Sequence, residues 1–204
     1  MNKPKRVGIF GGTFDPPHIG HLILASEARQ QLALDHIYFV LSADPPHKQD
    51  REITPIEHRL RMLELALEGQ EKFKISHIEI DRPGPHFALD SIKQFQDELP
   101  ESELIYLIGG DSLRDLLTWK QPLELVARVD SIGVMRRPFT DIDLDSLIQE
   151  IPELEKKLIF VNTPLLEISS REIREKVGKG SHFRNYLIES VFSYILANQL
   201  YQTN

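Results

Sequence analysis

Two histidines beside a glycine pair are the residues of this chain whose types and spacing most clearly indicate chemistry. Gly11 and Gly12 follow a short apolar run at 6–10, and His18 and His21 stand three residues apart where a helical pattern begins. Residues three apart on a helix share a face, so both imidazoles should point to one place. Glycines at such a junction let a ligand approach the backbone, and the helix N-terminus favours anions. The segment therefore predicts a phosphate-binding site.

The elements that must position these residues follow from the hydrophobic periodicity. Short apolar runs alternate with amphipathic stretches along the first two thirds of the chain. Thr54 is expected to cap one helix, with Pro55 and Glu57 in its first turn and Gly69 at its end. We expect strands at 6–10, 37–41, 73–80, 104–108 and 131–135, and further helices at 19–32 and 88–99. This alternation is typical of an α/β doubly wound, Rossmann-like parallel sheet.

The ends of two predicted strands carry glycine-rich turns. The first strand runs into Gly11, and the fourth runs into Gly109, Gly110 and Asp111. In doubly wound sheets, ligands bind outside the carboxyl ends of the strands where the strand order reverses. We therefore expect the two turns to face one crevice.

The last third of the chain predicts a small C-terminal helical extension rather than a second domain. It contains a short acidic helix after 141, a strand at 158–161, the segment 168–174 and a final helix from about Leu187. Residues 178–181 have the composition of a phosphate loop, but no strand precedes them, and a helix end followed by a turn is the better interpretation. We expect residues 1–204 to form a single domain.

Composition excludes several functional classes. The chain has 204 residues, 41% of them hydrophobic, and no cysteine, which excludes disulfides and thiolate chemistry. A formal net charge of −7 argues against a nucleic-acid partner, because such binding needs a basic surface. No apolar run is long enough to span a bilayer, so we expect no membrane association and a cytoplasmic location.

Residues 11–21 match a known signature. They read Gly-Gly-Thr-Phe-Asp-Pro-Pro-His-Ile-Gly-His, which resembles the first motif of the nucleotidyltransferase superfamily, and residues 18–21 also spell the signature of class I aminoacyl-tRNA synthetases. Over nearly its whole length the chain most resembles the bacterial nicotinate-nucleotide adenylyltransferase family. The motifs that carry this resemblance, besides residues 11–21, are residues 45–48, 81–85 leading to Asp90, 109–111 with Trp119, 136–138 and 168–174.

The resemblance implies an enzyme of NAD biosynthesis that transfers AMP from ATP to nicotinate mononucleotide, with Mg²⁺ arriving with ATP and no protein-bound metal. The catalytic residues that it implies are His18, His21 and Lys48. For ATP binding it implies Gly11, Gly12, Thr13, Phe14, His18, His21, Gly109, Asp111, Arg137, Ser169, Ser170 and Arg174. For the acceptor mononucleotide it implies Thr13, Lys48, Arg82, Phe87, Ala88, Asp111 and Trp119. It leaves a homo-oligomer open.

Several of these residues also have a structural interpretation. Lys48 can be a solvated loop lysine, and Asp111 can cap the helix that follows it. Trp119 can belong to the core rather than stack on a pyridine ring. Ser169 and Ser170 can open a helix without touching a ligand. His36, His58, His77 and His182 match no motif and are expected to be structural or to face solvent.

The chain departs from the family pattern in the expected pyridine-binding region. Phe87 and Ala88 replace the usual Tyr-Thr, Lys120 replaces an aromatic residue, and Arg171 replaces a threonine. The loss of two hydroxyls leaves the choice between nicotinate and nicotinamide open, and we hypothesise that the charge of Lys120 favours the acid.

Other functions fit the sequence less well. Pantetheine-phosphate adenylyltransferase shares the first motif but has a shorter chain and lacks the Ser-Ser-x-x-Ile-Arg ending in this form. An aminoacyl-tRNA synthetase would need an anticodon-binding region and more positive charge. A nucleotide sensor that binds without turnover stays open, although binding alone rarely needs the full histidine set. No Ser-His-Asp arrangement or His-Glu-x-x-His zinc motif is evident.

Overall fold

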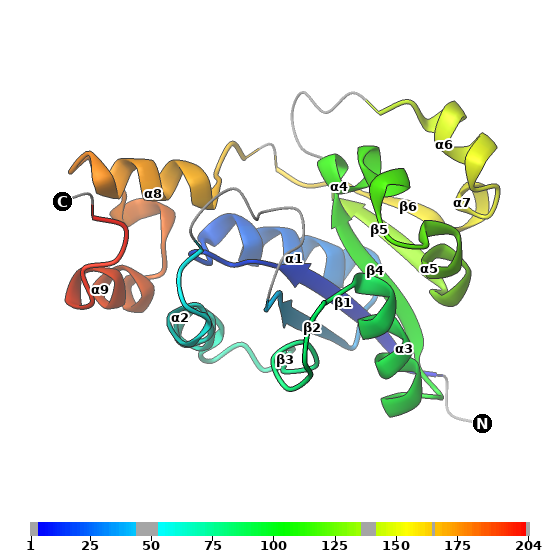
Figure 1. Cartoon of the computed structure of the whole chain (residues 1–204), viewed down its shortest axis with the longest axis horizontal. Helices are drawn as coiled ribbons and strands as arrows, with labels where there is room; N and C mark the ends of the chain where they lie inside the picture. The colour runs from blue at the N-terminus through cyan, green and yellow to red at the C-terminus, as the bar shows by residue number, and fades with distance from the viewer. Residues whose placement is uncertain (1–3, 44–52, 136–141, 165, 203–204) are drawn as a thin grey trace.

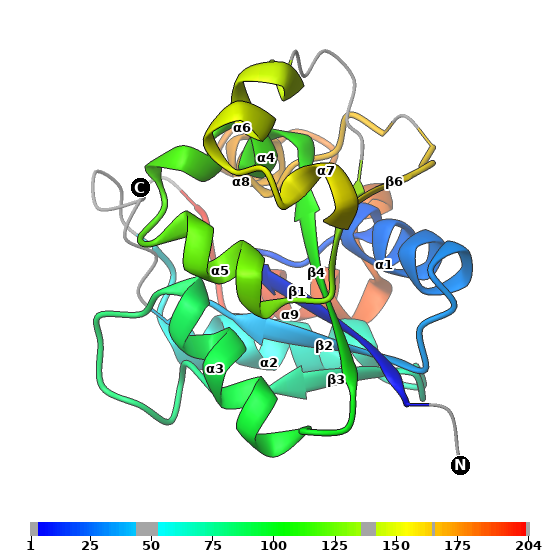
Figure 2. The same ribbon diagram turned by 90° about the vertical axis from the view of Figure 1, so that its right-hand side faces the viewer.

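A computed structural model describes residues 4–43, 53–135, 142–164 and 166–202 of the chain. Its centre is a six-stranded sheet in the order β3-β2-β1-β4-β5-β6, in which all neighbouring strands are parallel (Figures 1 and 2). The strands are β1 (Arg6–Gly12), β2 (His36–Leu41), β3 (Phe73–Ser76), β4 (Glu103–Gly109), β5 (Ser131–Met135) and β6 (Leu158–Val161). The predicted doubly wound, Rossmann-like architecture is confirmed.

Helices cover both faces of this sheet. The α-helices are α1 (Ile19–Gln31), α2 (Ile56–Leu67), α3 (Ala88–Glu98), α4 (Gly110–Arg114), α5 (Pro122–Arg128), α6 (Leu144–Glu150), α7 (Leu154–Lys157), α8 (Ser170–Gly178) and α9 (Glu189–Ala197), and the 3-10 turns are η2 (Leu116–Thr118) and η3 (Arg184–Tyr186). Buried residues of α3, α5, α6 and α7 pack on one face of β1 and β4, whereas those of α1 and α2 pack on the other. Alternate residues of each buried strand therefore serve two separate cores.

The C-terminal helices form a third apolar cluster against α2. Met62 and Ala66 of α2 pack with Ile173 of α8 and with Val191 and Ile195 of α9. In Figure 1 these three helices lie together at one end of the molecule, and α6 and α7 lie at the other. The predicted C-terminal helical extension is therefore packed onto the sheet domain through α2.

Two local predictions were wrong. The strand expected at 73–80 ends at Ser76, because residues 77–80 turn away and bring Ile78 and Glu79 into buried positions. Thr54 does not cap α2: Pro55 is the N-cap residue and makes no side-chain capping bond. The carbonyl of Thr54 instead accepts a hydrogen bond from Arg59 Nε at 2.8 Å, a local contact at the start of the same helix.

The strand order reverses between β1 and β4. β1 pairs with β2 on one side and with β4 on the other, so the chain leaves their carboxyl ends in opposite directions. This reversal opens a crevice at the strand ends. Both glycine turns singled out in the sequence, at Gly11 and Gly109, lie at this edge.

Candidate active site

A cavity of about 500 Å³ lies at the carboxyl ends of β1 and β4. Residues from both glycine turns, from the start of α3 and from the start of α8 line it. The lining residues that the sequence had singled out are Gly11, Gly12, Thr13, Phe14, His18, His21, Phe87, Ala88, Gly109, Asp111, Trp119, Ser169, Ser170 and Arg174. Segments more than 150 positions apart in the chain thus converge on one space, as the strand reversal requires.

Three predicted site residues are not placed in the cavity wall. Lys48 and Arg137 lie outside the described residues. Arg82 does not line the cavity; its guanidinium lies 3.4 Å from the carbonyl of Phe87 and 3.3 Å from the hydroxyl of Ser91. Arg82 therefore contacts two residues that line the cavity, Phe87 and Ser91, without lining it itself.

His18 and His21 stack on each other at the start of α1. Their ring centroids are 3.7 Å apart with an interplanar angle of 26°. The backbone N–H of His18, the N-cap residue, donates to His21 Nδ1 at 3.1 Å. Because Nδ1 accepts, the ring proton of neutral His21 resides on Nε2, which is then a hydrogen-bond donor. The arrangement offers an N–H donor beside the N-terminal amides of α1, where an anion is favoured.

Two glycines of the signature make room for neighbouring rings. A Cβ on Gly12 would lie 2.8 Å from Cζ of Phe14, and a Cβ on Gly20 would lie 3.0 Å from Nδ1 of His18. Phe14 is fully buried and adopts a positive φ of 46°. The sequence explained Gly12 by ligand approach alone, whereas the structure shows that Phe14 also requires it.

Asp15 joins the signature to the C-terminal segment. Its side chain is 1% exposed, and Oδ1 accepts a 2.8 Å hydrogen bond from the hydroxyl of Tyr201. Arg174 donates to the Asp15 carbonyl at 2.6 Å, and its guanidinium lies 3.8 Å from Oδ2. Burial and the charge of Asp15 raise the pKa of Tyr201, so the phenol stays neutral and donates. This network holds Arg174 at the cavity.

The start of α8 forms another part of the wall. Ser169 is the N-cap residue, and its hydroxyl accepts from the N–H of Glu172 at 3.2 Å. The hydroxyl of Ser170 donates to the carbonyl of Pro16 at 2.8 Å. Ser169 therefore caps α8, as the structural interpretation predicted, whereas the hydroxyl of Ser170 has a partner in the signature that the sequence did not indicate. The N-terminal amides of this helix still lie at the cavity edge, where they favour an anion.

Sequence reasoning missed Arg59, which lies buried beneath the signature. Its guanidinium donates to four backbone carbonyls, those of Thr54 at 2.8 Å, Ser42 at 2.7 Å, and Thr13 and Ala43 at 3.2 Å. Burial lowers the pKa of Arg59, and the negative charge of Asp15 opposes this change. In the sequence, Arg59 is one polar residue in an amphipathic helix, so no local signal indicated this role.

The opposite side of the cavity is more apolar. Trp119 packs edge-on against Tyr106, with ring centroids 6.2 Å apart, and Lys120 Nζ lies 4.1 Å from the centroid of the Phe87 ring. Asp111 does not cap a helix: it lies in the first turn of α4, 3.5 Å from Arg114, and the N-cap residue is Gly109. A ligand with an aromatic ring could stack on these aromatic side chains, and a charged group on that ring could interact with Lys120.

Four further residues of this side were not predicted. Glu79, His86, Ser91 and Tyr106 are all buried and line the cavity. Ser91 donates to Glu79 Oε1 at 2.9 Å, and His86 Nε2 lies 3.0 Å from the carbonyl of Arg82. The sequence had placed Glu79 inside a strand, and Tyr106 reads as an ordinary strand aromatic, so nothing local marked either one.

Metal and membrane signals are absent from the part of the chain that the structure describes. No group of three or more histidine, aspartate or glutamate side chains there could hold a metal ion. Among the same residues, no helix has the length and apolar character to cross a membrane.

Of the four histidines expected outside the site, His58 hydrogen-bonds to the hydroxyl of Tyr194 at 2.9 Å, and His77 and His182 are exposed.

The sheet order, the crevice and the paired histidines define the class of protein. A sequence profile described as cytidylyltransferase-like matches residues 9–176. Among solved structures, nicotinic acid mononucleotide adenylyltransferase of Plasmodium falciparum, complexed with NaAD, superimposes with a TM-score of 0.82 at 22% identity, over 98% of each chain. At that identity the likeness shows the fold, which is that of the nucleotidyltransferases.

Curated relatives narrow this class further. A protein of Thermomicrobium roseum named as a probable nicotinate-nucleotide adenylyltransferase is 42% identical over 97% of this chain and 92% of its own length. Its namesake in Bacillus licheniformis is 38% identical over 98% of this chain and its whole length. The chain therefore belongs to the nicotinate-nucleotide adenylyltransferase family, whose reaction joins nicotinate mononucleotide to the AMP of ATP in NAD biosynthesis.

Proposed function

We propose that the cavity at the ends of β1 and β4 holds both substrates of this reaction, each on its own side. ATP binds beside α1 and α8, where His18, His21 and Arg174 line the wall. Nicotinate mononucleotide binds on the side of Trp119, Phe87 and Ala88. The stacked histidine pair carries this proposal, because it presents a ring N–H donor next to a helix N-terminus.

The reaction needs positioned charge rather than a base. The phosphate of a mononucleotide is mostly dianionic at neutral pH, because its second ionisation lies near pH 6. One of its oxygens attacks the α-phosphorus of ATP and forms the new P–O bond, while the bond from that phosphorus to the bridging oxygen of pyrophosphate breaks. Holding the two anions in line and neutralising the developing charge provides the catalysis.

The remaining predicted residues have assigned roles in the same proposal. Gly11, Gly12, Thr13 and Phe14 contact the nucleotides at the turn after β1, and Gly109 and Asp111 do so at the turn after β4. Ser169 and Ser170 contribute the amides at the start of α8. Arg82 supports the carbonyl of Phe87. Lys48 and Arg137 are proposed phosphate ligands on the strength of the family resemblance.

Mg²⁺ is proposed to enter with ATP. Hard divalent cations prefer oxygen ligands, and triphosphate oxygens and water supply them without a protein cage. Among the described residues, no group of three or more histidine, aspartate or glutamate side chains could hold a metal ion. When bound, the ion would neutralise phosphate charge. We further propose that the chain acts as a single domain in the cytoplasm without a nucleic-acid partner.

The test is pyrophosphate release from Mg·ATP with three acceptors in parallel: nicotinate mononucleotide, nicotinamide mononucleotide and phosphopantetheine. We expect a strong preference for nicotinate mononucleotide. His18→Ala and His21→Ala should each lower kcat about 100-fold or more, because each removes a charge-stabilising donor. Thermal unfolding of each variant controls for folding.

The other outcomes separate the alternatives. Release with phosphopantetheine alone would reassign the acceptor and keep the mechanism. Nucleotide binding without pyrophosphate release would indicate a sensor. Full activity in the two histidine variants would refute the roles given to them.

A further inference from the structure

Tyr106 is one of the buried polar residues of the cavity whose role the family motifs leave unassigned. It lies in the middle of β4, directly beside Ile9 of β1, and its side chain is buried among the apolar residues that α3 and α5 cover. The residue is only 8% exposed, yet it lines the cavity. A Cβ built on Gly11 would lie 3.6 Å from the Tyr106 hydroxyl oxygen. The hydroxyl therefore reaches the carboxyl end of β1, at the floor of the cavity.

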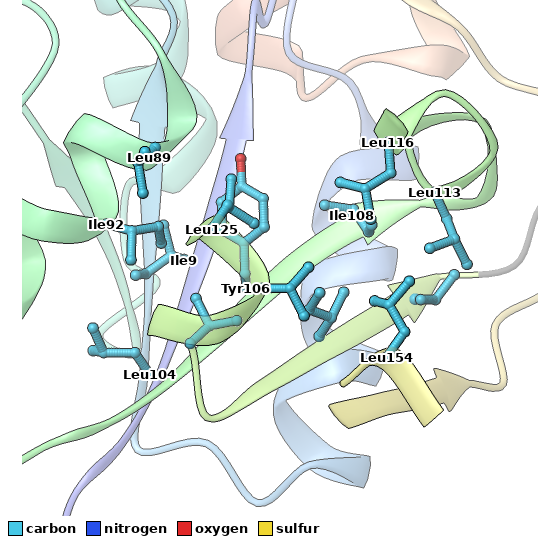
Figure 3. Packing of buried hydrophobic residues seen from close by; sticks show 14 of the residues in the cluster. Ile9, Leu89, Ile92, Leu104, Tyr106, Ile108, Leu113, Leu116, Leu125 and Leu154 are labelled. Atoms are coloured by element: carbon cyan, nitrogen blue, oxygen red, sulfur yellow. The ribbon is translucent and has the colours of Figure 1, made fainter. Parts of the chain in front are cut away.

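Figure 3 shows how the side chain is oriented. The ring packs among labelled leucine and isoleucine side chains, and the hydroxyl points along β1. Within residues 4–43, 53–135, 142–164 and 166–202, no group forms a hydrogen bond with this hydroxyl. Among the described residues, the ring of Tyr106 thus has many apolar contacts, whereas its hydroxyl has no hydrogen bond.

The hydroxyl oxygen is not among the fully buried polar atoms without a partner, because it faces the cavity. A ligand that fills the cavity would displace the water from this oxygen, and a hydroxyl without water needs a hydrogen bond in its place. Burial, together with the negative charge of Glu79, raises the pKa of Tyr106. The hydroxyl therefore stays protonated throughout the range of an enzyme assay and can donate a hydrogen bond to an oxygen of a ligand.

The position of Tyr106 identifies which substrate meets it. Its ring lies on the sheet face that packs against α3 and α5, and Trp119 contacts that ring edge-on. The histidine pair belongs to α1, which packs on the other face. The hydroxyl consequently opens into the half of the cavity that Trp119, Phe87 and Ala88 enclose.

We propose that the hydroxyl of Tyr106 is a binding group for the pyridine mononucleotide, donating a hydrogen bond to one of its oxygens. This inference rests on the proposed function, which assigns that half of the cavity to the acceptor substrate. It adds a binding residue that lies in a strand interior rather than in any of the recognised turn motifs.

The experiment compares Tyr106→Phe with Tyr38→Phe. Tyr38 lies in β2, packs against the same core and makes an edge contact with Phe95, but it does not line the cavity. KM is measured separately for nicotinate mononucleotide and for ATP, and the melting temperature is recorded for both variants. A titration of nicotinate mononucleotide into each protein, followed by calorimetry, gives Kd without turnover.

For Tyr106→Phe we expect KM and Kd for nicotinate mononucleotide to rise about 5- to 20-fold, the loss of one good hydrogen bond. KM for ATP should stay within about twofold of wild type, and the melting temperature should stay equal or rise. Tyr38→Phe should change none of the binding values. This combination separates a ligand contact from a structural one, because a structural hydroxyl would lower the melting temperature when removed.

Three results would overturn the proposal: an unchanged KM for the mononucleotide, an equal rise in both KM values, or a clear fall in melting temperature. Failure of the proposed function is distinguishable, because wild-type protein would then release no pyrophosphate with nicotinate mononucleotide at all.

Discussion

The hydroxyl of Tyr201 donates a 2.8 Å hydrogen bond to Oδ1 of Asp15 across 186 positions of sequence. Asp15 belongs to the signature that precedes α1, and Tyr201 follows α9. Oδ2 of the same carboxylate is buried and accepts no hydrogen bond from the residues that the structure describes, although Arg174 lies 3.8 Å away. The C-terminal segment thus provides a principal polar contact of a buried charge at the edge of the cavity.

Tyr201→Phe should lower the free energy of unfolding by about 1.5 to 3 kcal/mol, because it removes a hydrogen bond from a buried carboxylate. Urea unfolding measures this change. Tyr186→Phe is the control, since the Tyr186 ring lies under Lys176 in the same part of the chain, and its loss of a hydroxyl should cost less than about 0.5 kcal/mol. Equal effects in both variants would contradict the special role of the Tyr201–Asp15 bond.

Arg59→Met should destabilise the protein by about 2 to 4 kcal/mol, because it leaves the carbonyls of Thr13, Ser42, Ala43 and Thr54 without their shared donor. Arg61→Met, on the same helix, is the matched control: Arg61 is exposed and pairs with Glu64 at the surface, so its loss should cost less than about 1 kcal/mol. Chemical denaturation of both variants measures the free energy of unfolding. Equal losses in the two variants would contradict a larger stabilising role for buried Arg59.

Gly12→Ala should lower the stability of the protein, whereas Gly11→Ala should lower its activity and leave the stability almost unchanged. An added Cβ at position 12 meets the buried Phe14 ring at 2.8 Å, so we expect a stability loss of about 1 to 3 kcal/mol. At position 11 the nearest atom is 3.6 Å away, which is ordinary contact, so stability should stay within about 0.5 kcal/mol. Because Gly11 lines the cavity, its variant should still lose activity. Melting curves and initial rates test the pair, and full activity of Gly11→Ala would argue against close ligand approach there.

Lys120→Ala should reduce the preference for nicotinate over nicotinamide mononucleotide by about 2- to 5-fold, the effect of one exposed charge. The Lys120 ammonium lies over the Phe87 ring at the expected pyridine side of the cavity. The ratio of kcat/KM for the two acceptors measures this preference. Lys93→Ala removes a charge that pairs with Glu124 away from the cavity and should leave the ratio unchanged. An unchanged ratio in Lys120→Ala would refute the hypothesis that the charge of Lys120 favours nicotinate mononucleotide.

His36 should make the protein less stable in mild acid. Burial, with smaller contributions from Lys74, Lys72 and Lys5, lowers the pKa of His36 below its usual 6.5. Well above its ordinary pKa of 6.5 the residue is neutral in both states, so it contributes no pH dependence there. Below that pH the unfolded chain binds the proton first, so the free energy of unfolding falls as the pH falls towards the folded pKa. His36→Gln should reduce the difference in the free energy of unfolding between pH 7.5 and pH 5.5, measured by urea titration. An unchanged difference would mean that other groups cause the loss of stability in acid.

Much of the architecture followed from local patterns. Apolar periodicity located all six strands of the sheet, and two glycine turns predicted the crevice between β1 and β4, because parallel strands bring their carboxyl ends to one edge. The error at 73–80 arose because Ile78 and Ile80 continue the apolar pattern after the strand has ended at Ser76. A buried turn and a buried strand both place apolar residues in the sequence, so the apolar pattern alone does not distinguish them.

By itself, the sequence determined the doubly wound fold, the place of the crevice and the family, since helix caps, turns and apolar spacing depend on residues close together in the chain. Only the tertiary structure decided that Arg59 gathers four carbonyls, that Tyr201 serves Asp15, and that the Tyr106 hydroxyl opens into the cavity. Burial and hydrogen bonding depend on what surrounds a group in space. Those surroundings come from segments that the sequence separates by as many as 186 positions.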